Sequence, residues 1–544
     1  MKNLSKFLPI ILVILFSIPL ILPYIRPGFF PTHDGEWVVV RLTDMFRTLR
    51  DGQFPARYSG FLNHGFGYPL FNFTYPLPYY LGILIHFLRF SFVDSIKIIF
   101  AGSVIVSGIS FFLLINEFWK NKWAALCLSV LYIYLPYRMV NLYVRGSIGE
   151  SVSMAIFPIV FYFWLRLISR STVQNLTFTA VFFAALIITH NIMAVYFTVI
   201  LGVLCLSLVI TKNLKALKAS IISIFLGLGL SAFFWLPVIL EKKFIALSQV
   251  PIANRGYYFL QPLDLILPKW GYGIPDSASG FGYQLGWPQV GAFLLVLLTL
   301  AYKRSQVTKL FLSLTVLTFF LASLLFSFSS TIWKVTPLLS DINYPWTLLA
   351  PLGFLTTFLS GWIWQFKRMK LLLPIFAISA MFLVLPHSQP RAYNNYIDSH
   401  YFTNDSNTTS SNELMPLWVK TNPTQQPENK VEIISGEGVI KNIANNSKQT
   451  SFDVDLKTES NVQINTIYYP GWEAASSGKK IPISYDNNLG VMRLALSLGQ
   501  QSISLKFKET LTRQFANTIS LVSLFVLVIF YLTSVVRGSR SERV

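Results

Sequence analysis

The polar residues best suited to chemistry directly follow the first apolar segment, as the run His33, Asp34, Gly35 and Glu36. Two carboxylates separated by one glycine can act as a general base or bind a hard divalent cation. We therefore treat Asp34 and Glu36 as candidate catalytic residues and as candidate ligands of Mg²⁺ or Mn²⁺, with His33 as a candidate substrate-binding residue. A helix cap is the alternative, because a carboxylate in this place also accepts backbone N–H groups.

Arginines follow this run along a segment that we place outside the membrane. A guanidinium group suits phosphate, and a lipid phosphate would lie at the same depth. Arg41 and Arg57 are therefore candidate substrate-binding residues. Two alternatives remain open: Arg41, Asp44, Arg47 and Asp51 have the spacing of ion pairs along one helix face, and headgroup binding without catalysis would explain the same arginines.

A second polar patch contains Arg145 and Glu150. These two charges either pair with each other or face the same cavity as Asp34, in which case Arg145 becomes a candidate substrate-binding residue. His190 and Asn191 interrupt a helical hairpin at its outer end and are further candidates of this kind. A lone histidine in such a place is more often structural than functional.

Aromatic residues are dense between residues 63 and 80, where prolines and glycines indicate an ordered, non-helical surface at the lipid interface. Tyrosines in such a surface usually form an aromatic belt, and stacking against a sugar is the alternative. Tyr344 and Trp346 begin another outer helix and are candidate substrate-binding residues, with Asp341 as a candidate cap.

Composition limits the class of protein that can position these residues. Of the 544 residues, 53% are hydrophobic, 16% are aromatic and only 12% are charged, with a net charge of +20. These values exclude a disordered chain and argue against one soluble globular domain. Cys127 and Cys205 both lie in apolar runs, which excludes a disulfide framework. The sequence contains neither a Walker A loop nor the zinc-hydrolase and serine-hydrolase motifs, so it does not support ATP-driven transport or zinc hydrolysis.

Long apolar runs predict a polytopic α-helical membrane protein with about twelve transmembrane helices. Basic clusters at alternate helix ends place both termini in the cytoplasm. This orientation requires that the apolar stretch 79–90 does not cross, so we expect an interfacial or re-entrant helix there. The predicted spans are 8–25, 95–115, 123–140, 151–169, 175–190, 192–210, 219–240, 289–302, 310–330, 346–366, 371–387 and 514–536.

Three parts follow from this pattern. Residues 1–387 form a transmembrane domain with a large first outer loop at 26–94. Residues 388–513 form an extracytoplasmic region, in which alternating apolar and polar residues predict a small antiparallel β-sandwich at about 431–510. Residues 514–544 form the final transmembrane helix and a basic cytoplasmic tail. We therefore expect a multi-pass protein of the cytoplasmic membrane.

Several of these runs resemble a family of bacterial and archaeal membrane proteins that is labelled 6-pyruvoyl-tetrahydropterin synthase-related. The carboxy-terminal region is similar to the β-domain of the related YfhO-like proteins. Both look similar to the GT-C glycosyltransferases, which take a sugar from a polyprenyl-phosphate carrier on the outer face of the membrane. The stretches that carry the resemblance are 33–36, 51–55, 65–72, 136–150, 189–191 and 343–346, and 468–472 with 477–480 for the β-domain.

The resemblance implies a GT-C-like fold and a catalytic role for Asp34, because an acidic residue of the first outer loop acts in catalysis in that superfamily. Glu150 is the nearest counterpart of a further acidic residue in the second outer loop. One residue departs from the pattern, since Thr347 follows Trp346 where the family typically has an arginine. The label implies no pterin chemistry, because the histidine cluster of the soluble pterin enzyme is absent from this sequence.

We therefore predict an inverting sugar transfer from a polyprenyl-phosphate donor to an envelope polymer, lipid or protein. Asp34 would be the general base, and Arg41, Arg57 or Arg145 would contact the leaving phosphate. A transporter or flippase of a lipid-linked saccharide and a non-catalytic cell-envelope scaffold remain alternatives. Membrane lipids are expected partners, whereas nucleic acid is not, because most of the positive charge lies at the cytoplasmic helix ends.

Overall fold

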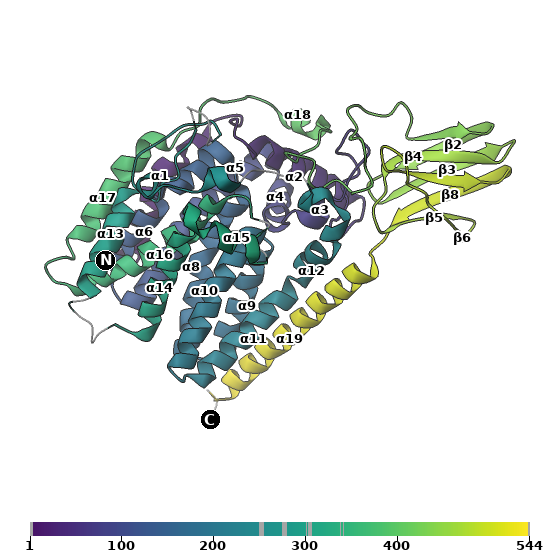
Figure 1. Cartoon of the computed structure of the whole chain (residues 1–544). Coiled ribbons are helices and arrows are strands. Elements are labelled where there is room, and N and C mark those ends of the chain that lie inside the picture. Colours follow the sequence, from purple (N-terminus) through teal and green to yellow (C-terminus); the bar gives the residue numbers. More distant parts are fainter. Residues whose placement is uncertain are drawn as a thin grey trace.

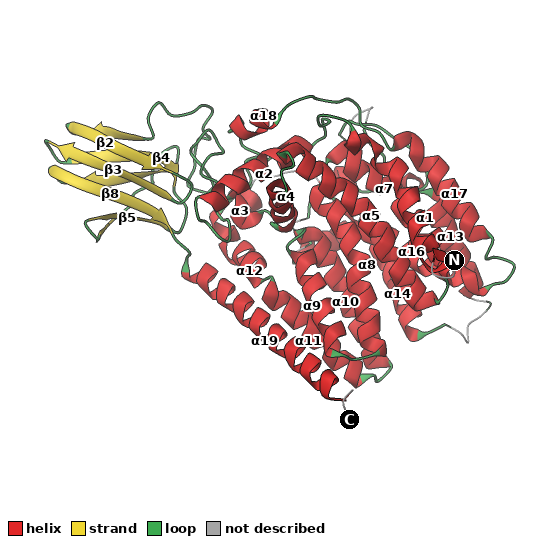
Figure 2. Cartoon of the chain, turned by 180° about the vertical axis from the view of Figure 1, so that it is seen from behind, coloured by secondary structure: helices red, strands yellow, loops and turns green. Residues whose placement is uncertain are grey.

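The computed structural model describes residues 4–249, 255–274, 280–300, 302, 307–337, 339–340 and 342–541. It consists of a bundle of helices with a β region at one end of it (Figure 1). The last helix, α19 (Leu511–Ser541), runs from the β region along the outside of the bundle to the carboxy terminus (Figures 1 and 2).

Within the described residues, six helical segments are long and apolar enough to cross a membrane, or nine when each of three bent helix pairs counts as one span. Every one of the twelve segments predicted from the sequence contains a helix, but three of these helices are short. Twelve spans therefore remain a prediction. The six segments are Phe7–Ile25 (α1, Leu4–Ile21, and η1, Leu22–Ile25), Phe92–Trp119 (α5), Ile148–Ser169 (α8), Asn191–Ile210 (α10), Pro345–Gln365 (η9, Pro345–Leu348; α16, Leu349–Leu359; η10, Ser360–Gln365) and Leu511–Ser534 in α19.

Three helix pairs are bent at a break of four residues or fewer. Their bend angles are 48°, 70° and 95°. Irregular backbone at membrane depth is tolerated where protein surrounds it. The pairs are α6 (Lys122–Ile133) with α7 (Pro136–Met139) and η2 (Val140–Arg145), α11 (Leu214–Leu230) with α12 (Ala232–Glu241) and η3 (Lys242–Phe244), and α14 (Lys309–Ser323) with η8 (Ser327–Ser329) and α15 (Ser330–Val335).

Several shorter helices complete the bundle. The stretch 79–90, which we expected not to cross, lies largely in the eleven-residue helix α4 (Leu77–Phe87). The other short helices are α2 (Gly35–Arg50), α3 (Leu70–Phe73), α9 (Val173–Ile187), α13 (Trp287–Leu300), α17 (Leu372–Val384) and α18 (Asp398–Thr403).

The β region confirms the strands expected from the alternating pattern. Its two antiparallel sheets have the strand orders β1-β4-β7 and β2-β3-β8-β5-β6. Alternate residues such as Phe452, Val454 and Leu456 point into a shared core. The strands are β1 (Val431–Ser435), β2 (Gly438–Asn445), β3 (Gln449–Leu456), β4 (Ser460–Ile467), β5 (Trp472–Ser476), β6 (Lys479–Ile481), β7 (Val491–Leu496) and β8 (Gly499–Phe507).

Residues from outside the β region complete its core. Tyr58 and Phe73 of the first outer loop and Ile245 after α12 are buried in the same apolar cluster as the strands. Tyr58 also donates its hydroxyl to the carbonyl of Ile467 at 2.8 Å, at the end of β4. The β region is therefore packed directly against the helical bundle.

Candidate functional site

Asp34 lies at the point where the chain enters α2. The backbone N–H of His33 donates to Val144 O at 3.0 Å and that of Asp34 donates to Arg145 O at 2.8 Å, which joins this turn to η2. Thr32, not Asp34, caps the helix, because its Oγ1 accepts from Gly35 N at 2.8 Å. The alternative in which the Asp34 carboxylate caps the helix is therefore wrong, and this half-buried carboxylate accepts no hydrogen bond from the described residues.

The second polar patch forms a buried ion pair. Arg145 Nη1 lies 2.5 Å from Glu150 Oε1, and Glu150 is only 1% exposed. Tyr137 and Asn141 donate to the other Glu150 oxygen at 2.6 and 3.2 Å. The pairing that we considered from the sequence is confirmed, and both carboxylate oxygens of Glu150 are hydrogen-bonded within the protein. The guanidinium of Arg145 also lies over the Trp346 ring, 4.5 Å from its centroid.

The same backbone hydrogen bonds bring these two patches next to each other. The Asp34 charge is close enough to act on Arg145, Tyr75, Tyr79 and Tyr344. Residues from the first outer loop, from the η2–α8 junction and from the start of η9 therefore surround one point. Tyr75 and Tyr79 come from the aromatic run near α4, and burial of Tyr79 among protein groups does not fit a lipid-facing belt.

His190 forms another side of this cluster. Its ring lies 5.1 Å from the Tyr75 ring, and its Nδ1 accepts from Met193 N at 3.4 Å as the cap of α10. The structural role that we considered for this histidine is thus confirmed. Burial lowers the pKa of His190 to about 4, although the Glu150 carboxylate opposes this shift, so the ring is neutral at neutral pH.

Some polar atoms of the cluster lack a partner. Among the described residues, no hydrogen bond reaches the Asp34 carboxylate, and Asn191 Oδ1 and Trp346 Nε1 are buried without one. Buried polar groups are normally satisfied. A ligand that donates to Asn191 and accepts from Trp346 would satisfy both.

Other predicted site residues lie at the edge of the cluster. Arg41 donates its Nε to Thr408 Oγ1 at 3.1 Å, and its charge acts on Tyr75 and Tyr79. His33 Nε2 lies 3.0 Å from Tyr272 O, on the exposed side of the turn. Asp341 lies outside the described residues.

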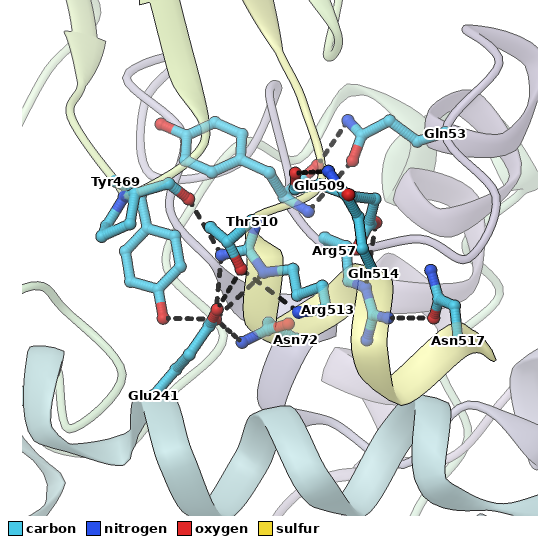
Figure 3. A network of polar contacts seen from close by, with 12 residues as sticks. Gln53, Arg57, Asn72, Glu241, Tyr469, Glu509, Thr510, Arg513, Gln514 and Asn517 are labelled. Atoms are coloured by element: carbon cyan, nitrogen blue, oxygen red, sulfur yellow. Dashed lines mark hydrogen bonds and ion pairs between the residues drawn. The ribbon is translucent and has the colours of Figure 1, made fainter. Parts of the chain in front are cut away.

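The structure does not bring Arg57 to the cluster. Its Nε lies 3.3 Å from Glu509 Oε1 and its Nη2 donates to Asn517 Oδ1 at 3.1 Å, at the start of α19 (Figure 3). The predicted ion pairs along α2 are also absent from the described contacts, because Arg47 donates to Phe402 O and Asp51 accepts from Ser447 N.

The two carboxylates that we considered for a cation have different neighbours. Glu36 accepts from Asn394 Nδ2 at 3.1 Å and acts on Tyr401, whereas Asp34 acts on Arg145 and Tyr75. No group of three or more His, Cys, Asp or Glu side chains is placed to hold a metal ion in the described part of the chain. The described residues therefore do not fit a Mg²⁺ or Mn²⁺ ion shared by Asp34 and Glu36.

Asp44, on the buried face of α2, makes the stability of the protein depend on pH. Burial raises the pKa of Asp44 from its ordinary 3.8 to about 7, although Ser59 and Arg47 oppose this. The folded protein thus binds this proton more tightly, and the stabilisation present below pH 4 is lost as the pH rises to about 7. We expect the melting temperature to fall over this range and Asp44→Asn to make the fall less steep. Equal slopes for both proteins in thermal unfolding would contradict this.

Tyr75, Tyr79, Tyr137 and Asn141 belong to the cluster but were not singled out from the sequence. Tyr75 had no signal beyond the general density of aromatics. Tyr137 and Asn141 precede Arg145 by eight and four residues, so helical spacing could have placed them on its face.

Comparison with known proteins agrees with this architecture. Residues 71–390 match the 6-pyruvoyl-tetrahydropterin synthase related domain, which is described as a membrane protein. The chain belongs to this family. The resemblance noted from the sequence is confirmed in this respect, and the protein is a membrane protein. Arg145, Glu150 and Trp346 lie inside the matched segment, whereas Asp34 and the β region lie outside it.

A relative of this member of the 6-pyruvoyl-tetrahydropterin synthase related family is an uncharacterized protein from Lactococcus lactis subsp. cremoris (strain MG1363). The two are 23% identical over 242 residues, which is 43% of this chain and 39% of the relative. The chain thus matches well under half of that protein, and the name of the relative carries no activity.

Proposed function

We propose that this protein is an integral membrane glycosyltransferase that moves a sugar from a polyprenyl-phosphate donor to an envelope acceptor on the outer face of the cytoplasmic membrane. The observation that carries the proposal is the half-buried Asp34 carboxylate, which has no hydrogen-bond partner among the described residues and whose backbone N–H donates to Arg145 O at 2.8 Å. A carboxylate of this kind can accept the proton of the attacking hydroxyl, and a guanidinium held in place can stabilise the negative charge on the leaving phosphate.

In this mechanism Asp34 takes the proton of the acceptor hydroxyl while that oxygen attacks the anomeric carbon. The bond from the anomeric carbon to the phosphate oxygen breaks, and the electron pair leaves with the polyprenyl phosphate. Because attack and departure occur on opposite faces, the anomeric configuration inverts. The proton remains on Asp34 until solvent removes it.

Arg145 is the group that we assign to the leaving phosphate. All three of its described hydrogen bonds, to Tyr137, Asn141 and Glu150, use Nη1. The described residues give its Nε and Nη2 no partner, and this side of the guanidinium matches the fork geometry that binds phosphate oxygens. Glu150 would then be a residue that holds Arg145, and Tyr344 and Trp346 would line the space for the sugar.

The orientation in the membrane belongs to the proposal. Both termini would be cytoplasmic and the β region extracytoplasmic, which the basic residues at the α5–α6, α8–α9 and α10–α11 junctions support. Donor phosphate and acceptor would then meet at the outer surface. The acceptor would be an envelope polymer, a lipid or a protein, and we expect no role for nucleic acid.

A deletion strain provides the first test of this function. Mass spectrometry of its envelope glycans should show the loss of one sugar substituent, which the wild-type gene restores. An unchanged glycan profile would contradict the proposal. The three bent helix pairs would also suit a transporter, so scrambling of labelled lipid-linked sugar by the protein in vesicles, without product, would favour a flippase. Restoration of a defect by the β region alone would favour a scaffold.

A further inference from the structure

A second buried ion pair lies away from the Asp34 cluster, between the end of α12 and the beginning of α19. Arg513 Nη2 and Nε lie 2.9 and 3.0 Å from Glu241 Oε2, and the two side chains are 0% and 3% exposed (Figure 3). Charges this deeply buried are tolerated when they are paired and hydrogen-bonded. The pair therefore forms a fixed joint between the two helices.

The Glu241 carboxylate also binds three other side chains. It accepts from Asn72 Nδ2 at 2.8 Å, from Tyr469 OH at 3.2 Å and from Thr510 Oγ1 at 2.9 Å. Asn72 belongs to α3 in the first outer loop, and Tyr469 precedes β5. One carboxylate thus holds the bundle, the first outer loop, the β region and the last helix together.

The Arg57–Glu509 ion pair also connects the first outer loop to the start of α19. Arg57 of the first outer loop pairs with Glu509, just before α19, and is only 2% exposed. The backbone N–H of Asn72 donates to Arg57 O at 2.9 Å, which ties the two attachment points to each other. The first outer loop is therefore held at two points against the β region and α19.

Tyr75 of the candidate site lies next to this joint in the chain. The segment that carries it is attached on one side through Asn72 to Glu241, and on the other side through Leu77 N, which donates to Ile188 O at 2.9 Å. Between these attachments, the Tyr75 ring contacts His190 and its hydroxyl is in range of the Asp34 charge. The place of Tyr75 beside Asp34 thus depends on where Asn72 is held.

We propose that Glu241 is a positioning residue for the Asp34 site. Its carboxylate, fixed by Arg513, holds Asn72 and Tyr469 at one point, so that the Tyr75 side of the site and the β region form one body. This inference rests on the proposed function and adds that the geometry around Asp34 is set in part from the β region. An acceptor that bound to the β region would then lie at a fixed position relative to Tyr75 and the Asp34 site.

Two variants distinguish the contact of Glu241 with the first outer loop from its contact with the β region. Asn72→Ala removes the hydrogen bond between the first outer loop and Glu241 and leaves the Glu241–Arg513 pair intact. Glu241→Gln removes the charge that binds both Asn72 and Tyr469. Glu473→Gln is the matched control, because Glu473 pairs with Lys480 and Lys508 on the surface of the β region. All proteins are studied as the full chain in nanodiscs of phosphatidylethanolamine and phosphatidylglycerol.

Two measurements do not require activity. Hydrogen–deuterium exchange reports on residues 70–79, and spin labels at Lys479→Cys and Ser399→Cys, with Cys127 and Cys205 changed to serine, report on the placement of the β region. We expect Asn72→Ala to speed exchange in 70–79 and to leave the label distance unchanged. Glu241→Gln should also broaden the distance distribution, and the control should change neither.

The transfer rate completes the test. A displacement of a site residue by about 1 Å can cost up to roughly 100-fold in rate, so we expect Asn72→Ala to lower kcat about tenfold with an unchanged KM for the polyprenyl-phosphate sugar. Unchanged exchange or unchanged kcat in Asn72→Ala, or an unchanged distance distribution in Glu241→Gln, would overturn the inference. Absence of transfer by the wild-type protein would instead overturn the proposed function, and exchange and distance would still decide the role of Glu241.

Discussion

Replacing Asp34 with asparagine is expected to lower the rate of sugar transfer by at least about 100-fold, since a positioned general base contributes roughly 10²–10⁴. The amide keeps the size of the side chain but cannot take the proton of the acceptor hydroxyl. The cap of α2 should survive, because Thr32 and not Asp34 accepts the helix N–H. The membrane level and the melting temperature should therefore stay close to those of the wild-type protein.

Glu36→Gln distinguishes the general base from a metal site. Glu36 is bound to Asn394 and has different neighbours from Asp34, so we expect this variant to keep most of its transfer rate. The rates of both variants can be compared at equal membrane abundance with a labelled donor. Equal loss in the two variants, restored by added Mg²⁺ or Mn²⁺, would contradict the role of Asp34 as base and favour the cation instead.

Replacing Glu150 with glutamine is expected to have the largest effect on stability. The change leaves the Arg145 side chain, which is only 14% exposed, without its counter-charge. Breaking a buried ion pair by removing one partner typically costs about 3–5 kcal/mol. Tyr137 and Asn141 would also lose a charged acceptor. We expect a large fall in melting temperature in detergent, together with a loss of transfer, because Arg145 is no longer held opposite Asp34.

Glu473→Gln provides the comparison for this result. Its carboxylate pairs with Lys480 and Lys508 at 3.1 and 2.9 Å, yet it is 39% exposed. Exposed ion pairs contribute about 1 kcal/mol or less, so the melting temperature should barely change. A Glu150→Gln protein that is as stable as Glu473→Gln would show that the burial of the Arg145 pair has been overestimated.

The sequence predicts the elements of this fold well because each follows from a local pattern. Apolar runs mark the helices within the twelve predicted spans, and alternation marks the strands around Phe452, Val454 and Leu456. The number of membrane spans does not follow from the apolar runs in the same way, because α9, α13 and α17 are shorter than a membrane-crossing helix. Composition alone does not determine whether such short helices cross the membrane.

Contacts between distant parts of the chain could not be derived in this way. Tyr58 completes the core of the β region, and Arg57 pairs with Glu509, although more than 400 residues separate them. No local spacing rule connects such positions. For this reason Arg57 was assigned to phosphate from its residue type, whereas the structure gives it an acidic partner.

The candidate site was predicted in outline. The sequence singled out Asp34 because it and Glu36 flank a glycine directly after the first apolar segment, and it singled out Arg145 and Glu150 as a second polar patch outside the membrane. It left open whether Arg145 paired with Glu150 or faced the same cavity as Asp34, and the structure confirms the pair with Glu150. The joining of the two patches through backbone hydrogen bonds between 33–34 and 144–145 depends on tertiary folding.

The central claim is that this chain transfers sugar with Asp34 as the base. The most direct measurement uses purified protein in nanodiscs, a polyprenyl-phosphate sugar labelled in the sugar, and envelope acceptor material from the deletion strain. We predict that the label moves to the acceptor with inverted anomeric configuration in the wild-type protein and not in Asp34→Asn. Transfer at the same rate by Asp34→Asn, or a product with retained configuration, would contradict the account.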